Sequence, residues 1–290
     1  MRSLVSAVLV WLVLAVPSAA AEPLRVVASF SVLADLVAQV GGDEVAVSSL
    51  VPPGGEPHEW QPEPADVRRI AGADLVVVNG LGLEGWLDRL VGSSGFAGPV
   101  LVASRDVIPL RGPTGMPDPH AWHSLDEARR YAAAIAQELG RLRPEAAAEF
   151  TGNLAAFERT LDGLADWVEA RLEAVPPAAR VVVTTHDAFA YLGRDYGITF
   201  LAPAGLDSAA QPSARRMAQI VEEIRRTGVR TVFRESGGDD RLARTLAAEA
   251  GIAVGAPLFA GTLSAPGGPA DGYAPMWRQN LSLMLEAMPR

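Results

Sequence analysis

The chain has 290 residues, a length that allows one large or two medium domains, and 49% of them are hydrophobic, enough to bury a substantial core. The formal net charge of −9 and the pI near 5.0 argue against a nucleic-acid-binding protein. The sequence contains no cysteine, which excludes a disulfide framework and a lipid attached to an N-terminal cysteine.

The first residues have the organisation of a secretory signal peptide. Arg2 gives a positive start, the stretch 4–16 is continuously apolar, and small residues follow at 18–21. The apolar stretch is shorter than the roughly 20 residues that a membrane-spanning helix needs. We therefore expect residues 1–21 to be a cleaved signal peptide, which leaves an exported, soluble and periplasmic protein without a lipid anchor.

Residues 22–143 alternate short apolar stretches with amphipathic patterns, which is typical of a parallel sheet covered by helices. The predicted strands are 24–30, 45–51, 74–79 and 99–103. The predicted helices are 32–40, 64–71, 83–90 and 125–142. We expect these elements to form an N-terminal α/β lobe.

Residues 144–175 are predicted to form one long helix that links two lobes. Apolar residues recur there at steps of mostly four and three, namely Phe150, Leu154, Phe157, Leu161, Leu164, Val168 and Leu172. Pro144 fits the first turn, and the pair 176–177 of prolines ends the helix. At 1.5 Å per residue it would be roughly 40 Å long and would act as a rigid strut. The alternative is a helix that belongs wholly to one domain.

Residues 176–290 repeat the first arrangement and are predicted to form a C-terminal α/β lobe. The predicted strands are 180–185, 199–202, 231–235 and 253–257. The predicted helices are 188–196, 213–227, 241–250 and 273–288. The predicted fold class is therefore α/β, with two similar lobes of parallel sheets flanked by helices and joined by one long rigid helix.

The chain has only four histidines, and three of them lie in loops that suggest one metal site. His58 and His120 follow prolines, and His186 ends the apolar stretch that starts at 180. Neutral imidazole is the commonest metal-binding side chain. Because no cysteine is available, a nitrogen-rich site for zinc or a related divalent ion is the first chemistry to consider.

The remaining histidine, His123, has two interpretations. It lies three residues after His120, so both rings could share one face of a helical turn and bind the same ion. Alternatively it forms a hydrogen bond near the helix that begins after Ser124. Asp118 and Asp187 either orient imidazoles as hydrogen-bond acceptors or cap the helices that follow them.

An ordered set of motifs extends over essentially the whole mature chain. In chain order they are PHEWQPEPADVRRIAGADLVVVNG at 57–80, DPHAW at 118–122, TTHDAFAYLGRDYGI at 184–198, VFRES at 232–236 and the helix at 273–285. The set resembles the solute-binding proteins of zinc and manganese ABC importers. This resemblance implies two α/β lobes joined by a rigid helix, one metal ion in the cleft between them, and delivery of that ion to a membrane permease.

The resemblance also implies a ligand set. The imidazole positions of the family match His58, His120 and His186, and histidine at the third position is typical of the zinc-type branch, whereas manganese-type members carry a carboxylate there. Gly261 stands where manganese-type members place an aspartate. The fourth ligand stays open, and the candidates for it, or for hydrogen-bond partners of the ligands, are Glu56, Glu59, Glu235 and His123.

We therefore predict a high-affinity periplasmic zinc-binding receptor that is not an enzyme and that carries Zn²⁺ as its transported ligand. The expected partners are an ABC permease and its ATPase subunit at the inner membrane, with a periplasmic metallochaperone as a further candidate. We expect no nucleic-acid partner and a monomeric protein.

Three alternatives compete with this prediction. A manganese- or iron-specific receptor of the same family is the first. A zinc-dependent hydrolase is the second, because three histidines and an open position also hold catalytic zinc, but no His-Glu-x-x-His helix or serine nucleophile elbow is present. An adhesin-like surface protein is the third, and the missing lipidation cysteine weakens it.

Overall fold

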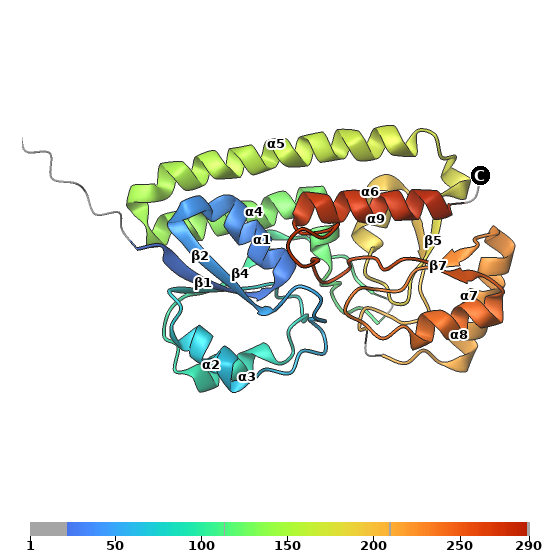
Figure 1. Cartoon of the computed structure of the whole chain (residues 1–290), viewed down its shortest axis with the longest axis horizontal. Helices are drawn as coiled ribbons and strands as arrows, with labels where there is room; N and C mark the ends of the chain where they lie inside the picture. Colours follow the sequence, from blue (N-terminus) through green and yellow to red (C-terminus); the bar gives the residue numbers. More distant parts are fainter. Residues whose placement is uncertain (1–21, 113, 209, 289–290) are drawn as a thin grey trace, which may run out of the picture.

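The N-terminal lobe is built on a sheet of four parallel strands in the order β2-β1-β3-β4 (Figure 1). The computed structural model describes residues 22–112, 114–208 and 210–288, so the predicted signal peptide lies outside the described residues. The strands are β1 (Leu24–Phe30), β2 (Val45–Val51), β3 (Leu75–Val78) and β4 (Val100–Val102). The helices are α1 (Ser31–Gly41), α2 (Pro64–Ala71), α3 (Leu87–Ser94) and α4 (Leu125–Leu142), with the 3-10 turns η1 (Gly42–Glu44), η2 (Ala103–Asp106) and η3 (Ala121–His123).

Helix α3 begins four residues later than the sequence pattern predicts. The residues of the predicted first turn form a loop instead, and the side chain of Glu84 stabilises this loop. Its Oε1 accepts hydrogen bonds from the hydroxyl of Ser29 and the amide of Asn79, both at 2.6 Å. Glu84 therefore stabilises the carboxyl end of β3, and the helix starts only after this loop.

The C-terminal lobe repeats the same topology with shorter strands, in the order β6-β5-β7-β8 and again all parallel. The strands are β5 (Val181–Val183), β6 (Thr199–Leu201), β7 (Thr231–Val232) and β8 (Ala253–Val254), and η5 (Pro177–Ala179) precedes them. The helices are α6 (Ala190–Tyr196), α7 (Ala214–Thr227), α8 (Arg241–Ala250) and α9 (Tyr273–Ala287). The predicted fold class is confirmed.

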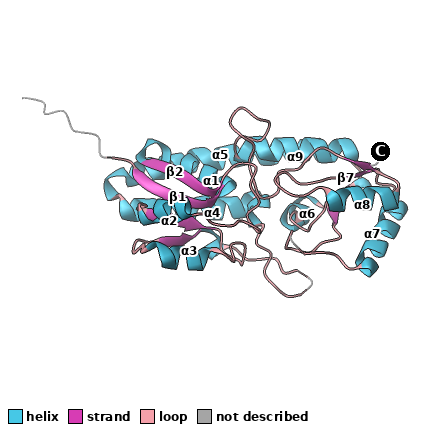
Figure 2. Ribbon diagram, turned by 60° about the horizontal axis from the view of Figure 1, so that its bottom comes forward, coloured by secondary structure: helices cyan, strands magenta, loops and turns pink. Residues whose placement is uncertain are grey.

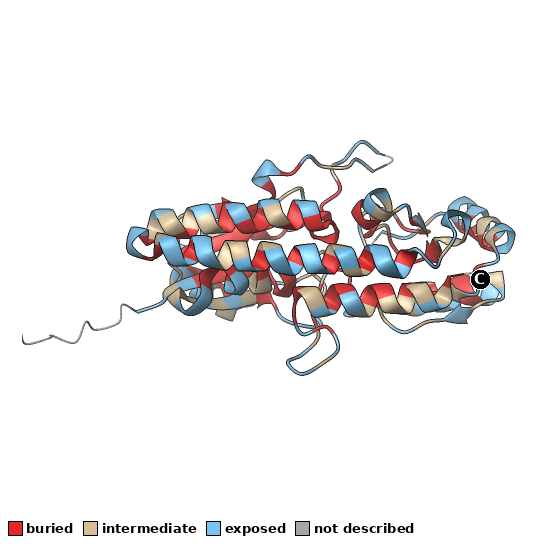
Figure 3. Cartoon of the chain, turned by 90° about the horizontal axis from the view of Figure 1, so that it is seen from above, coloured by how far each residue is buried: buried red, intermediate tan, exposed pale blue. Residues whose placement is uncertain are grey.

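Helix α5 (Ala147–Leu172) has 26 residues, follows η4 (Pro144–Ala146) and runs along both lobes (Figure 1). Six of the seven predicted apolar positions are buried, and Leu154 is half-buried. Figure 3 shows buried residues recurring along its length. The helix packs against α1, α4 and α9, so its apolar stripe joins elements of both halves of the chain. Among the described residues no helix has the length and apolarity needed to cross a membrane.

The end of α5 is fastened to the C-terminal lobe by one arginine. The guanidinium of Arg180 donates hydrogen bonds to the carbonyls of Leu172, Val175 and Tyr196 at 2.9, 3.0 and 3.1 Å. The carbonyls at the end of a helix have no partners within it, and a cation is favourable at that end. Arg180 thus joins the ends of α5 and α6 to the start of β5.

The main hydrophobic core is continuous through both lobes. It contains the N-terminal sheet, α5 and α9, and it extends to Val182 and Phe233 in the C-terminal lobe. Their neighbours Val181, Val183 and Val232 face the other way, into a second core with α7 and α8. Successive residues of a strand point to opposite faces, which explains the division. Apart from α5 and α9, the chain in the region between the two sheets is mostly loops (Figure 2).

The continuous core predicts that both lobes unfold together. Leu164 on α5 is fully buried, and the change Leu164→Ala should lower the free energy of unfolding by about 2–5 kcal/mol through lost burial and a new cavity. Denaturant unfolding followed by far-UV circular dichroism and by tryptophan fluorescence should give one shifted transition in both signals.

The matched control is Arg159→Ala on the exposed face of α5, which should change the free energy of unfolding by no more than about 0.5 kcal/mol. Two separate transitions, with only one of them shifted by Leu164→Ala, would contradict the continuous core.

Candidate metal centre

His58 lies on the loop between β2 and α2 and is half-buried. The chain turns at Gly54, whose φ of +82° lies in the left-handed region that glycine favours. The amide of Gly54 donates to Thr262 Oγ1 at 2.7 Å, and the indole of Trp86 donates to the carbonyl of Pro57 at 2.9 Å. Bonds to both lobes therefore hold the loop that presents His58.

His120 lies in the segment between β4 and α4 and is fully buried, with 1% of its surface exposed. The side-chain amide of Asn79, at the end of β3, donates to the carbonyl of Pro119 at 3.0 Å. From the other lobe, the hydroxyl of Tyr191 on α6 donates to the carbonyl of Asp118 at 2.9 Å. His120 is therefore fixed by contacts from both sides of the cleft.

His186 follows β5, at the carboxyl end of the central part of the second sheet, and is 3% exposed. The hydroxyl of Thr184 donates to the carbonyl of His186 at 2.9 Å, which stabilises the turn directly after the strand. Ligands of open α/β sheets bind at the carboxyl ends of the strands, and all three histidine loops lie at such ends.

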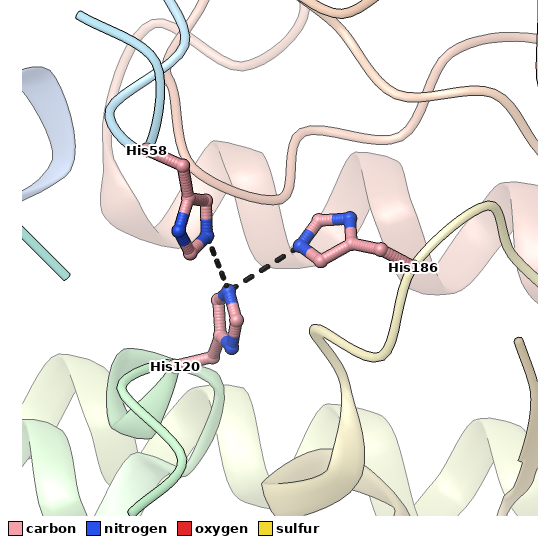
Figure 4. Close-up of side chains that lie close together, drawn as sticks. All are labelled: His58, His120 and His186. Carbon is pink, nitrogen blue, oxygen red and sulfur yellow. Dashed lines mark hydrogen bonds between the residues drawn. The ribbon is translucent and has the colours of Figure 1, made fainter. Parts of the chain in front are cut away.

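The three histidines from these separate loops meet at one point (Figure 4). His120 Nε2 lies 3.0 Å from His58 Nε2 and 3.3 Å from His186 Nε2. All three ligand atoms lie within 4.8 Å of one another. Three nitrogens bound at about 2.0–2.1 Å to a tetrahedral ion would lie about 3.3–3.4 Å apart, so the spacing is close to what one small cation needs.

Buried carboxylates contact the far side of two of the rings. His120 Nδ1 lies 2.8 Å from Asp118 Oδ1, and His186 Nδ1 lies 2.5 Å from Glu235 Oε2. A carboxylate at Nδ1 keeps the proton on that nitrogen and leaves the lone pair on Nε2. Nitrogens at about 3 Å from one another can share either a proton, as in the hydrogen bonds drawn in Figure 4, or a bound cation.

The pKa values of the three imidazoles differ in direction. Burial lowers the pKa of His58 to about 3 and lowers the pKa of His120 well below its ordinary value. Burial alone would also lower the pKa of His186, but the charge of Glu235 and the hydrogen bond to it outweigh burial and raise the pKa. His58 and His120 are therefore neutral and ready to bind an ion at neutral pH, whereas His186 competes for a proton.

Two carboxyls beside the histidines also have shifted pKa values. Burial raises the pKa of Asp118 to about 7, and its Oδ2 has no hydrogen-bond partner among the described residues. Burial alone would raise the pKa of Glu235, but the charge and the hydrogen bond of His186 hold it below the ordinary value. A buried carboxylate with an unpaired oxygen is costly, and a nearby cation would reduce that cost.

The three glutamates predicted as further ligands or hydrogen-bond partners differ in how they lie relative to the histidines. Glu235 contacts His186 Nδ1, and its Oε1 also accepts a hydrogen bond from the hydroxyl of Thr185 at 2.6 Å. Glu56 is half-buried and its Oε1 accepts the amide of His58 at 3.1 Å, whereas Glu59 is exposed. None of these carboxylates belongs to the group of converging ligand atoms found among the described residues.

His123 does not point to the group of converging histidines. Its Nε2 lies 2.8 Å from the carbonyl of Ala260, and the indole of Trp122 donates to the same carbonyl at 2.8 Å. Its ring packs 4.4 Å from that of Phe189, and the residue is buried. In the structure the hydrogen-bond partner of His123 thus comes from the segment between β8 and α9.

Gly261, the position at which the resemblance places an aspartate in manganese-type proteins, is closely packed. A Cβ atom there would lie 2.8 Å from Cγ and 3.0 Å from Cδ of Pro57. The rigid proline ring cannot rotate away, so any side chain at 261 would require the loop that carries His58 to shift. The missing carboxylate and the position of His58 are thus coupled.

Sequence reasoning missed the residues that fix the histidine loops from outside them. These are Asn79, Trp86 and Tyr191. A polar residue directly after an apolar strand is the one signal that could have indicated Asn79. Nothing local to Trp86 or Tyr191 shows that its polar atom reaches a distant carbonyl.

The fold and the converging histidines define a metal-binding receptor of the kind that serves ABC importers. Residues 26–287 match the family of zinc-uptake complex component A, periplasmic, and the chain belongs to this family. The family consists of solute-binding receptors, not enzymes, that work with an ABC permease and its ATPase. The protein therefore binds a divalent metal ion, and the predicted family is confirmed.

Curated relatives with related sequences carry manganese in their names. The manganese-binding lipoprotein MntA of Halalkalibacterium halodurans is 28% identical over 268 residues, which is 92% of this chain and 89% of that protein. The manganese ABC transporter substrate-binding lipoprotein PsaA of Streptococcus pneumoniae is 30% identical over 280 residues, with 92% of this chain and 90% of that protein covered.

Solved structures of this architecture include the periplasmic zinc binding protein TroA from Treponema pallidum. It has a TM-score of 0.87 and 26% identity, and the match covers 92% of this chain and all of that one. A cadmium-bound periplasmic metal binding protein from Candidatus Liberibacter asiaticus has a TM-score of 0.81 and 28% identity, covering 90% of this chain and 98% of that one.

The predicted localisation, periplasmic without a lipid anchor, is contradicted by these relatives. MntA and PsaA are named lipoproteins, so they are held at a membrane by a lipid. The absence of cysteine excludes one chemical form of attachment and does not decide where the chain resides. The relatives support a solute-binding protein that faces the outside of the cell.

The raised pKa of His186 predicts how metal binding depends on pH. A proton on His186 blocks its nitrogen, so affinity should be highest above that pKa and should fall as the pH drops through it, beginning above the ordinary value of 6.5. Zinc titration against a chelator of known affinity at a series of pH values measures this dependence.

The change Glu235→Gln removes the charge that raises the pKa of His186, so the fall in affinity should move to lower pH. Affinity that does not change between pH 5 and 8, roughly the range in which a histidine titrates, would contradict a ligand role for His186.

Proposed function

We propose that the protein is a zinc receptor that binds one Zn²⁺ through His58, His120 and His186 and delivers it to an ABC permease. The observation that carries the proposal is the convergence of three Nε2 atoms within 4.8 Å, with no carboxylate in the group found among the described residues. Imidazole suits zinc, whereas carboxylate, carbonyl and water oxygens suit manganese.

The packing around the group supports the same choice. Asp118 and Glu235 contact Nδ1 atoms, so they orient the rings and leave the Nε2 atoms for the ion. The Cβ position of Gly261 is closed by Pro57, which disfavours a carboxylate ligand from that segment. A fourth position would then be filled by water or by Glu56, whose Oε1 already accepts a hydrogen bond from the amide of His58.

A manganese receptor is the second candidate, and the names of MntA and PsaA favour it. Glu56 and Glu235 would have to move toward the ion to supply oxygen ligands. Each of them is already engaged, Glu56 with the amide of His58 and Glu235 with Thr185 and His186. Zinc requires no such rearrangement, so we favour it.

We also propose how the chain is divided for this task. After removal of residues 1–21, residues 22–143 form one lobe, 144–175 the linking helix and 176–290 the other lobe. The bounds of α5 and the two separate sheets support this division. Helix α9, although part of the last segment, packs on α5 and α1, so it reinforces the link between the lobes.

Metal content and competition test the proposal. The purified protein, stripped with a chelator and reloaded, should hold one zinc per chain by elemental analysis and should retain it in the presence of excess manganese. His186→Ala should weaken zinc binding by more than about 100-fold, because loss of a group that only orients a ligand already costs 10–100-fold.

His123→Gln is the matched control, since it alters a buried histidine outside the group and should keep zinc affinity near that of the wild type. Thermal melting of both variants establishes that they fold. Preference for manganese in the wild type would overturn the zinc assignment, and zinc retained by His186→Ala would overturn the ligand set.

A further inference from the structure

A cavity of about 700 Å³ opens beside His186, and the chemistry proposed above does not use most of it. Its wall on one side is the loop of Glu56 and Glu59, and on the other it consists of the segments before and within the first turns of α7 and α8. Both α7 and α8 lie on the side of the molecule away from α5 (Figure 1). Because its lining includes exposed residues and the buried His186, the cavity connects solvent with one of the three histidines.

Charges in the cavity are mainly negative. The ionisable residues of its lining are Glu56, Glu59, Glu235, Asp239, Arg241 and His186. Glu235 contacts His186, and Asp239 forms an ion pair with Arg241. Glu56 and Glu59 form no ion pair among the described residues, so the carboxylates of the lining outnumber its cationic groups.

These two carboxylates lie at different depths in the cavity. Glu59 is exposed, Glu56 is half-buried with its Oε1 at the amide of His58, and His186 at the inner end is 3% exposed. A cation that approaches from solvent would therefore meet Glu59 first, then Glu56, and then His186, the histidine that lines the cavity. Clefts lined by charges of one sign concentrate ions of the opposite sign and increase their association rates.

The size of the cavity indicates what it can admit. A divalent ion with six water molecules needs on the order of 200 Å³, since each water takes about 30 Å³ in the liquid. The volume of about 700 Å³ admits such a hydrated ion. An anionic metal chelate would also fit by volume, but the excess of carboxylates in the lining would repel it.

We propose that this cavity is the entry route of the metal, in which Glu59 and Glu56 attract the hydrated divalent cation and pass it to the three histidines. The proposal rests on the ligand set proposed above. It assigns Glu56 and Glu59 a role in the rate of capture, distinct from the role of the histidines in affinity.

Association kinetics test the role of the charges. Metal-free protein is mixed with ZnSO₄ in a stopped-flow instrument, and tryptophan fluorescence reports binding because the ring of Trp122 lies 5.3 Å from that of His120. Glu59→Gln should lower the association rate constant about two- to fivefold at low ionic strength. The difference should vanish near 1 M salt, where the Debye length is about 3 Å. The dissociation rate constant should stay unchanged.

Glu169→Gln is the matched control, because it removes the same charge from the exposed face of α5. An equal effect of both variants, or no effect of Glu59→Gln, would overturn steering by the cavity. A faster dissociation in Glu59→Gln with an unchanged association rate would also overturn it, because that result makes Glu59 a ligand.

A blocking variant tests the route independently of charge. Gly238 lines the cavity, and a Cβ atom there would meet only the carbonyl of Glu235, at 3.9 Å, so a larger side chain can be placed. Gly238→Trp should slow association and dissociation by a common factor of about ten and leave the dissociation constant unchanged. Gly163→Trp, at an open position on α5, controls for the added indole.

Unchanged rates in Gly238→Trp would overturn the route. Repeating the mixing with MnCl₂ separates the two proposals, because steering depends on the charge of the ion and not on its identity. If manganese binds more tightly than zinc but both show the same loss of rate in Glu59→Gln, the entry route holds and the zinc assignment fails.

Discussion

The convergence of three imidazole nitrogens from separate loops is the constraint on which the site depends. The three ligand atoms lie within 4.8 Å of one another, so the loops that carry them have to be held from outside. Asp118 and Glu235 hold two of the rings through Nδ1, and Trp86 with Thr262 holds the loop of the third. The folding energy of the whole chain thus maintains a cluster of nitrogens that a bound cation would stabilise.

The continuous core extends this constraint to the lobes. One histidine comes from the C-terminal lobe and two come from the N-terminal lobe, so any change in the angle between the lobes would separate the ligands. Helices α5 and α9 pack on each other and share the main core with both sheets, and Arg180 fastens the end of α5. Movements needed for loading and release are therefore expected in the loops, where His58 is the most accessible of the three ligands.

Much of this arrangement was predictable because it depends on local patterns. The bounds of β1, β2, α2, α4 and α8 agree with the predicted ranges, since apolar periodicity and proline or glycine boundaries are strong there. The start of α3 was not predictable, because Glu84 closes a loop through the distant Ser29. The converging histidines followed from motifs, whereas the bonds from Tyr191 and Asn79 to the loop of His120 depend on tertiary contacts that no local pattern encodes.

The contact between Gly261 and Pro57, at the boundary of the lobes, bears on the choice of metal. Relatives named for manganese and a solved structure named for zinc share this fold, so the architecture alone does not select the ion. In this chain the Cβ position of Gly261 is blocked by Pro57, the residue directly before His58. A side chain at 261 would therefore require either this segment or the loop of His58 to shift. The proposed preference for zinc thus depends on packing between two loops of different lobes, and not on the ligand residues alone.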